Sequence, residues 1–266
     1  MKKTTLVCTL TLSLATILPV AAADTPPAPV NSTNAAVESV KIWPMPAELP
    51  SMPPGVNPAA YPWPKGIENL IRIKADQAKA KAIPSSIELV FDGDSITDGW
   101  RNQPIWNERY AKLHAFDFGV GADKTEHVLW RLSQGQMDGI HPRLIVLLIG
   151  TNNGNPPEQV AEGVAAIVAE YRKRCPDAVI LLQGIFPRGN LPDNPARARI
   201  KTINGILSKM DDGKHVIYID FGDKFLSADG TLSAEIMPDF LHPNAKGYQI
   251  WADAIQPVID KVFPKK

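Results

Sequence analysis

The chain has 266 residues, of which 44% are apolar and 21% are charged, values that fit a globular protein with a sizeable core. Its formal net charge is zero and no basic run appears along the sequence, which argues against a nucleic-acid partner. A neutral surface likewise gives no reason to expect binding to anionic membranes.

The first 23 residues have the composition of a secretory signal peptide. A pair of lysines precedes an apolar stretch over 6–20, and three alanines at 21–23 provide a small-residue cleavage site. The apolar stretch is shorter than the roughly 20 residues that span a bilayer, so an uncleaved anchor is disfavoured. We therefore expect residues 1–23 to be removed, no membrane span to remain, and the mature protein to be periplasmic or secreted.

Cysteine usage predicts no covalent cross-link. Cys8 lies inside the expected signal peptide, which leaves Cys175 alone in the mature chain, so no internal disulfide is expected. Cys175 precedes a proline at an expected helix end and is interpreted as a small apolar residue. No Cys/His spacing suits zinc and no acidic loop suits calcium, so the sequence predicts neither a metal site nor another cofactor.

Residues 24–66 form a proline-rich segment that holds 11 of the 25 prolines. Proline fixes φ and removes the amide donor, which excludes a helix or an inner strand here. The part up to about residue 39 predicts a flexible leader. The remainder carries large apolar residues and is expected to lie extended along the surface of the next domain, with packing favoured over carbohydrate stacking for Ile42, Trp43, Tyr61 and Trp63.

From residue 67 onward, helix-like and strand-like segments alternate. Apolar residues at helical spacing predict helices over 68–83, 125–134, 157–175, 195–210 and 245–262. Short apolar runs predict strands over 87–91, 115–118, 144–149, 178–183 and 216–220. Such alternation predicts βαβ units with right-handed crossovers and a mostly parallel sheet.

Polar motifs follow three of these strands and precede the last helix. They are Asp92–Thr97, Gly119–Asp123, Gly150–Asn153 and Asp239–Pro243. In an open α/β sheet, ligands bind beyond the carboxyl ends of the strands, where the first three of these motifs are expected. Each motif is weak alone, since Gly-Asp-Ser also forms common turns, but four in this order are hard to reach by chance.

Ser95 is the candidate nucleophile, and a serine hydroxyl needs a base that takes its proton. Imidazole is the side chain whose unperturbed pKa lies near neutrality, which directs attention to the five histidines. His242 has a carboxylate three residues before it, and on a helical turn that spacing would place Asp239 beside the ring. His141 and His215 share this spacing, but His141 sits in a loop before Pro142 and His215 precedes a strand at its amino end, the wrong edge of the sheet. By themselves these two residues also fit a surface helix start. A histidine base predicts activity that rises with pH and levels off, without need of a divalent metal.

These motifs resemble those of the SGNH (GDSL-type) hydrolase family. Gly93–Thr97 is similar to the family's first motif, Gly150–Asn152 to its third and Asp239–His242 to its last. Three further segments resemble the branch that includes the catalytic subunits of platelet-activating-factor acetylhydrolase 1b, namely Phe118–Asp123, His127–Leu132 and Phe186–Gly189. The resemblance spans about residues 85–264, whereas the leader and the proline-rich segment lie outside it.

The resemblance implies a flavodoxin-like three-layer α/β sandwich with a mostly parallel five-stranded sheet over residues 67–266. It also implies a triad of Ser95, His242 and Asp239. The implied oxyanion hole takes the backbone N–H groups of Ser95 and Ala122 and the side-chain amide of Asn152, although Asn152 also fits a simple turn former.

The family usually has glycine at the position of Ala122. If this position requires a positive φ, alanine costs about 1–2 kcal/mol there. The alternative is that Gly121 supplies the turn. Asp94 is interpreted as a brace of its loop, and Asp92, Asp123 and Asn153 are expected to form local hydrogen bonds.

The sequence therefore predicts an exported serine esterase that hydrolyses small acyl esters, with acetyl groups on carbohydrate as the favoured substrate. A lysophospholipase or thioesterase and a catalytically silent carbohydrate-binding protein stay open as alternatives. A flavin-binding domain is disfavoured, because Asp92 and Asp94 would repel a phosphate. The acyl length, the alcohol, hydrolysis as against acyl transfer, and the oligomeric state are left open by the sequence.

Overall fold

A computed structural model describes residues 53–65, 67–83 and 87–264, which belong to one compact unit. The expected signal peptide and residues 24–52 lie outside the described residues. Five strands form the sheet: β1 (Leu89–Gly93), β2 (Ala115–Asp117), β3 (Leu144–Leu148), β4 (Val179–Gln183) and β5 (Val216–Ile219).

Helices connect these strands. The α-helices are α1 (Ile67–Ala82), α2 (Ser95–Asp98), α3 (Pro104–Arg109), α4 (Thr125–Ser133), α5 (Pro157–Arg174), α6 (Pro195–Leu207) and α7 (Ala245–Val262). Short 3-10 helices cover Pro58–Ala60, Gly99–Asn102, Ala111–Leu113, Ser208–Met210 and Gly222–Phe225.

All five strands are parallel, in the order β2-β1-β3-β4-β5. This is the strand order of flavodoxin-like folds, so the predicted fold class is confirmed. The chain runs from β1 to one side and returns to pair β3 on the other side of β1. The carboxyl ends of β1 and β3 therefore flank the point where ligands bind in such sheets.

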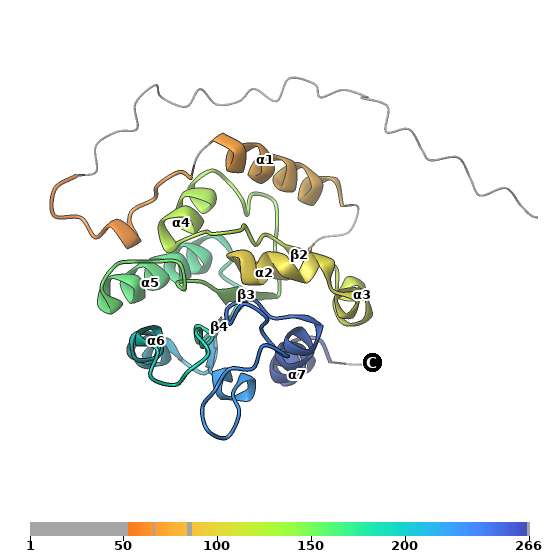
Figure 1. Ribbon diagram of the computed structural model, residues 1–266. Coiled ribbons are helices and arrows are strands. Elements are labelled where there is room, and N and C mark those ends of the chain that lie inside the picture. The colour runs from red at the N-terminus through yellow and green to blue at the C-terminus, as the bar shows by residue number, and fades with distance from the viewer. Residues whose placement is uncertain (1–52, 66, 84–86, 265–266) are drawn as a thin grey trace, which may run out of the picture. The chain divides into compact units, whose positions relative to one another are not determined.

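Helices cover both faces of the sheet, because successive strand residues point to opposite sides. Val90 and Ile145 belong to a core that also contains residues of α1, α4, α5 and α6. Their neighbours Phe91 and Val146 belong to a second core with residues of α2, α3 and α7. Figure 1 shows the strands between these two groups of helices. The fully apolar run at β3 is buried on both faces, as the sequence predicts.

Strand β1 begins and ends two residues later than the sequence predicts. Asp92 continues the strand instead of opening a loop, because its buried carboxylate accepts hydrogen bonds from Arg131, Gln136 and Tyr171. The helices α2 and α3 are absent from the prediction, since four and six residues are too few to show helical periodicity.

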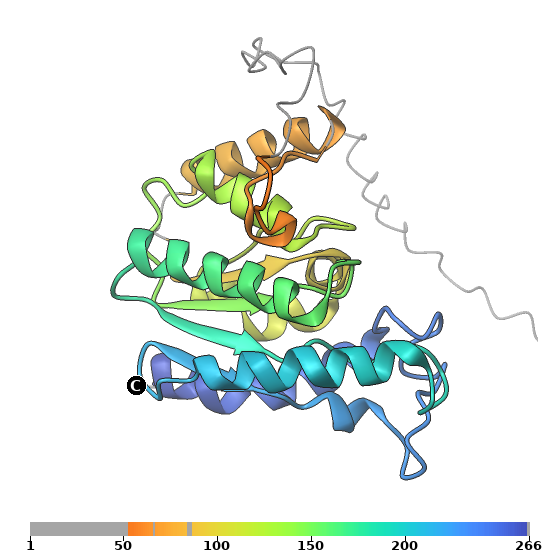
Figure 2. The same cartoon turned by 90° about the vertical axis from the view of Figure 1, so that its left-hand side faces the viewer.

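Residues 53–65 lie across α4 and α5, as Figure 2 shows for this orange part of the chain. The Asn57 amide nitrogen donates to the backbone oxygen of Gln159 at 2.8 Å, and the Trp63 N–H donates to the Glu126 oxygen at 3.1 Å. Gly163 makes room in α5, because an added Cβ there would lie 2.3 Å from the Ala59 carbonyl oxygen. Residues 53–65 of the proline-rich segment are thus packed against the helical layer at several points.

Cys175 is the C-cap of α5 and is buried, with no disulfide. Burial raises the pKa of its thiol. Its place agrees with the predicted role as a small apolar residue at a helix end.

Candidate active site

Ser95 lies at a sharp turn between β1 and α2, of which it is the first residue. Gly93 lets this turn pass close to β3, because an added Cβ would lie 2.1 Å from the Leu148 carbonyl oxygen. The Asp94 side chain caps α2, with Oδ1 accepting the Ile96 N–H at 3.0 Å. The strand-to-helix turn therefore presents the Ser95 hydroxyl at the carboxyl edge of the sheet.

Asp94 is buried directly beside Ser95. Burial raises its pKa to about 7, although the hydrogen bond from the Ile96 N–H and the nearby His242 and Arg188 act in the opposite direction. A carboxyl that is partly protonated at neutral pH adds less than a full negative charge next to the hydroxyl. The predicted bracing role of Asp94 thus fits both its hydrogen bond and its charge.

His242 and Asp239 come from the segment before α7 and meet Ser95 across the sheet edge. The Ser95 Oγ lies 2.9 Å from His242 Nε2, and His242 Nδ1 lies 2.6 Å from Asp239 Oδ2. These are hydrogen-bond distances, so a hydroxyl, an imidazole and a carboxylate stand in line. Ser95 and His242 are 147 residues apart in the chain, whereas Asp239 and His242 are 3 residues apart.

A non-helical turn joins Asp239 to His242. The prediction of a helical turn at these residues is therefore wrong. Phe240 has a φ of 57°, in the left-handed region, and α7 begins only at Ala245. The N–H groups of Leu241 and His242 both donate to Asp239 Oδ1, at 3.1 and 2.8 Å. This arrangement holds one carboxylate oxygen on the backbone and leaves the other for the imidazole ring.

The Asp239 carboxylate is stabilised in its charged form. Partial burial raises its pKa, but hydrogen bonds from the His242 backbone and ring outweigh this and hold the pKa below its ordinary value. An ionised Asp239 is what orients an imidazole and stabilises an imidazolium. Since the side chains of His242 and Asp239 are 43% and 56% exposed, water screens the pair and it adds little to stability.

Ala122 and Asn152 lie in the loops that follow β2 and β3. The Asn152 Nδ2 donates to the Asp123 carbonyl oxygen at 3.0 Å, which brings the two loops together. An amide nitrogen has two hydrogens, so a second donor stays available on Asn152. Arg188 supports the same loop, with Nη1 donating to the Thr151 carbonyl oxygen at 3.1 Å.

Ala122 itself adopts the positive φ, at 58°, and Gly121 does not. An L-residue with a Cβ is strained in this region by about 1–2 kcal/mol. The alternative in which Gly121 supplies the turn is therefore wrong.

Replacing Ala122 by Gly is expected to raise the free energy of unfolding by about 1 kcal/mol, because the strain disappears. Urea denaturation measures this change. Ala169→Gly, at an exposed position inside α5, is the matched control and should lower stability by about 1 kcal/mol. Equal destabilisation by both variants would contradict strain at Ala122.

A buried network links β1 to the loop after β2. The guanidinium of Arg131, only 1% exposed, donates from Nη2 to Asp92 Oδ1 at 2.8 Å and from Nε to Asp123 Oδ2 at 2.9 Å. Burial lowers the pKa of Arg131, but the two carboxylates outweigh it and the pKa is raised. The sequence predicts local hydrogen bonds for Asp92 and Asp123, but Asp92 also bonds residues 39 to 79 positions away, and the role of Arg131 is missed by the sequence reasoning.

His127 belongs to the cap of α4, where Nδ1 accepts the Lys124 N–H at 3.0 Å. Burial first, and then the nearby cations Lys65, Lys124 and Arg131, lower its pKa to about 4. The folded-state pKa is thus below that of the unfolded chain, near 6.5. Its contribution to stability is complete above pH 6.5 and is lost as the pH falls through 4.

His127→Gln keeps an acceptor at the cap without a titrating group. Between pH 7 and pH 4, the parent protein should lose on the order of 2 kcal/mol of unfolding free energy relative to this variant. Chemical denaturation of both proteins across this pH range measures the difference. Parallel stability curves would show that His127 titrates alike in the folded and unfolded states.

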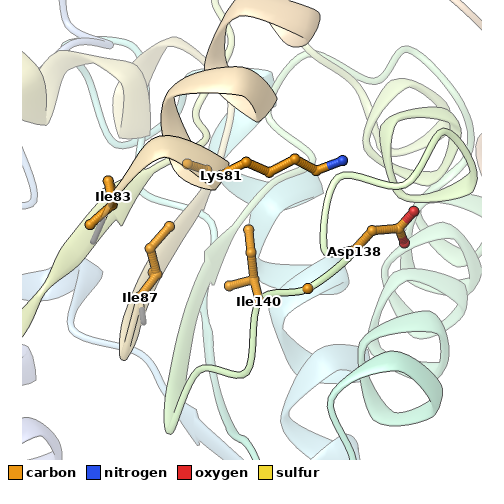
Figure 3. A pocket seen from close by; sticks show the side chains of 7 residues that line it. Lys81, Ile83, Ile87, Asp138 and Ile140 are labelled. Atoms are coloured by element: carbon orange, nitrogen blue, oxygen red, sulfur yellow. The ribbon is translucent and has the colours of Figure 1, made fainter. Parts of the chain in front are cut away.

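Neither Ser95 nor His242 lines any of three cavities that the described residues form. One, of about 440 Å³, lies at the opposite edge of the sheet, where Ile87 and Ile140 precede β1 and β3. Figure 3 shows its apolar wall, with Lys81 and Asp138 also lining it. These three cavities therefore lie apart from the candidate site.

Comparisons with known proteins agree with this geometry. Residues 91–250 match the GDSL-like lipase/acylhydrolase family. Platelet-activating factor acetylhydrolase IB subunit alpha1 of Homo sapiens is 39% identical over 163 residues, which are 60% of this chain and 70% of the relative. Subunit alpha2 of Mus musculus is 40% identical over the same length, covering 71% of that protein.

Two solved structures share the fold. One from Streptococcus pneumonia, named after platelet activating factor, has a TM-score of 0.61 at 22% identity and covers 72% of this chain and 95% of its own. The acetyl xylan esterase AlAXEase has a TM-score of 0.56 at 20% identity and covers 65% of this chain and 100% of its own. In the described part of this chain, every helix is too short or too polar to cross a membrane. The chain belongs to the GDSL-like lipase/acylhydrolase family and is an ester-hydrolysing enzyme.

Proposed function

We propose that this enzyme is exported and removes small acyl groups, above all acetyl, from carbohydrate by means of Ser95, His242 and Asp239. The observation that carries the proposal is the hydrogen-bonded line from Ser95 Oγ through the His242 ring to Asp239. Removal of residues 1–23 as a signal peptide would place the enzyme outside the cytoplasm, where polymeric glycans are found.

Acylation begins when the Ser95 oxygen attacks the ester carbonyl and its proton passes to His242 Nε2. The negative charge on the carbonyl oxygen is met by the N–H groups of Ser95 and Ala122 and by the Asn152 amide. Asp239 stabilises the imidazolium, which then gives its proton to the departing alcohol. A water molecule attacks the acyl-enzyme with His242 again as base, so the acid leaves and Ser95 regains its proton.

The small amount of exposed apolar surface on the described residues favours a polar alcohol over a lipid. Leu191 is the one large apolar side chain that is exposed among residues 53–65, 67–83 and 87–264. A lipid acylhydrolase needs apolar surface for the chain of its substrate, whereas an acetyl group on a long glycan does not. The names of the relatives and of one structural neighbour, acetylhydrolase and acetyl xylan esterase, also concern acetyl groups.

The test is a panel of esters given to the purified exported protein: acetylated xylo-oligosaccharides, p-nitrophenyl acetate, p-nitrophenyl palmitate and a long-chain lysophospholipid. Acetyl esters are expected to have a kcat/KM about 100-fold or more above that of the long-chain esters, because only the short acyl group needs no apolar groove. Acetate release measured by itself separates hydrolysis from transfer to another alcohol. Rapid cleavage of the lysophospholipid beside untouched acetylated sugars would favour the lipid alternative.

A further inference from the structure

Lys65 reaches the loop of Ala122 from the proline-rich segment. Its ammonium donates to the Gly121 carbonyl oxygen and lies 3.4 Å from Asp123 Oδ1. The side chain is 22% exposed, and the carboxylate that it meets is 1% exposed. A cation so placed interacts with a carbonyl in surroundings from which much of the water is excluded, and there the interaction is stronger than at an open surface.

The Gly121 carbonyl and the Ala122 N–H belong to the same peptide group. A trans peptide is planar, so its C=O and its N–H point in opposite directions. Fixing the carbonyl on Lys65 therefore fixes the direction of the Ala122 N–H. A flip of this peptide would turn the N–H away from the carbonyl of a bound ester and put an oxygen in its place.

Strain at Ala122 favours such a flip. Rotation of the peptide changes φ of Ala122 by about half a turn, which moves it from 58° to the region that L-residues prefer. The hydrogen bond from Lys65 to the Gly121 oxygen opposes this relaxation. A glycine at position 122 would lack the strain and would have less need of the lysine.

We propose that Lys65 is a positioning residue of the oxyanion hole, which holds the Gly121–Ala122 peptide in the orientation where its N–H faces the oxyanion; this rests on the esterase mechanism above. Lys65 precedes residue 91, where the match to the family begins. The segment that carries it is anchored on α4 and α5 by Trp63 and Asn57. The proline-rich segment thereby becomes part of the catalytic apparatus of this chain.

Lys65→Met is expected to lower kcat for p-nitrophenyl acetate about 10- to 30-fold with little change in KM, since loss of a whole oxyanion donor costs about 100- to 1,000-fold. Lys65→Arg keeps a cationic donor and should recover to within about 3-fold of the parent enzyme. Lys74→Met, which removes a lysine that bonds only a neutral Gln77 side chain, is the matched control and should leave kcat unchanged.

A double-variant cycle provides the decisive readout. In an Ala122→Gly background, Lys65→Met should lower kcat about 3-fold or less, because the strain that drives the flip is gone. A lysine that only stabilises the fold would give the same loss in both backgrounds, and this result would overturn the proposal. Full activity of Lys65→Met would also overturn it, provided that Ser95→Ala is inactive; if Ser95→Ala is active, the proposed mechanism itself fails.

Discussion

Replacing Ser95 by Ala is expected to lower kcat about 10⁴-fold or more with any ester that the enzyme hydrolyses. The oxygen that attacks the carbonyl is removed, and neither His242 nor Asp239 can form the acyl-enzyme in its place. The oxyanion donors and the binding surface stay, so a small residual rate above the uncatalysed reaction is expected. Initial rates with p-nitrophenyl acetate, together with mass spectrometry of the trapped acyl-enzyme, measure both aspects.

The fold should survive this change, because the Ser95 hydroxyl bonds the exposed His242 ring. Thermal unfolding of Ser95→Ala should therefore match that of the parent protein. Ser133→Ala, which removes an exposed hydroxyl at the end of α4, is the matched control and should keep full activity. Retention of most activity by Ser95→Ala would mean that another nucleophile performs the reaction.

Replacing Arg131 by Met is expected to lower the free energy of unfolding by about 3–5 kcal/mol. The substitution keeps much of the side-chain volume but leaves Asp92 and Asp123 buried without their shared cation. Gln136 and Tyr171 still donate to Asp92, and Lys65 still lies 3.4 Å from Asp123 Oδ1, so the penalty comes from losing the buried cation that the two carboxylates share. Urea denaturation followed by circular dichroism measures the loss.

Arg174→Met is the matched control, because Arg174 forms a partly exposed pair with Glu170 on α5. Such pairs contribute about 0–1 kcal/mol, so the control should be nearly as stable as the parent protein. If the two arginine variants unfold at the same urea concentration, the buried network does not hold the loop. A loss of activity in Arg131→Met beyond that explained by unfolding would show that the network also aligns the oxyanion loop.

Much of the fold could be predicted because its signals are local. The closing helix α7 covers Ala245–Val262 in both prediction and structure, and the strands differ by one or two residues at their ends. Apolar runs and helical spacing are read from neighbouring residues, and parallel pairing follows from their alternation. The short helix α2 and the turn at Phe240 carry no such signal, since their shape depends on contacts with the rest of the chain.

In the candidate site, too, residues in recognisable motifs could be predicted, whereas residues that act through distant contacts could not. The sequence brings Ser95, Asp239 and His242 together because each belongs to a motif with a known place at the sheet edge. Lys65 and Arg131 are missed as parts of the site, because their partners lie far along the chain and no spacing rule connects them. The available signals were weak: Lys65 follows five prolines and two aromatic residues in the segment 53–65, which holds no other charged residue, and Arg131 is an arginine on the buried side of an amphipathic helix.

Trp100, Trp106 and Trp251 form a cluster that shapes the intrinsic tryptophan fluorescence of this protein. Trp100 lies 4.9 Å from Trp251 and 6.3 Å from Trp106, measured between ring centroids. Indole rings this close exchange excitation energy, so three of the six tryptophans emit as one group. Emission from this group therefore follows the packing of the 3-10 helix Gly99–Asn102, α3 and α7, whereas Trp130 in α4 and Trp63 beside it report on the opposite helical layer.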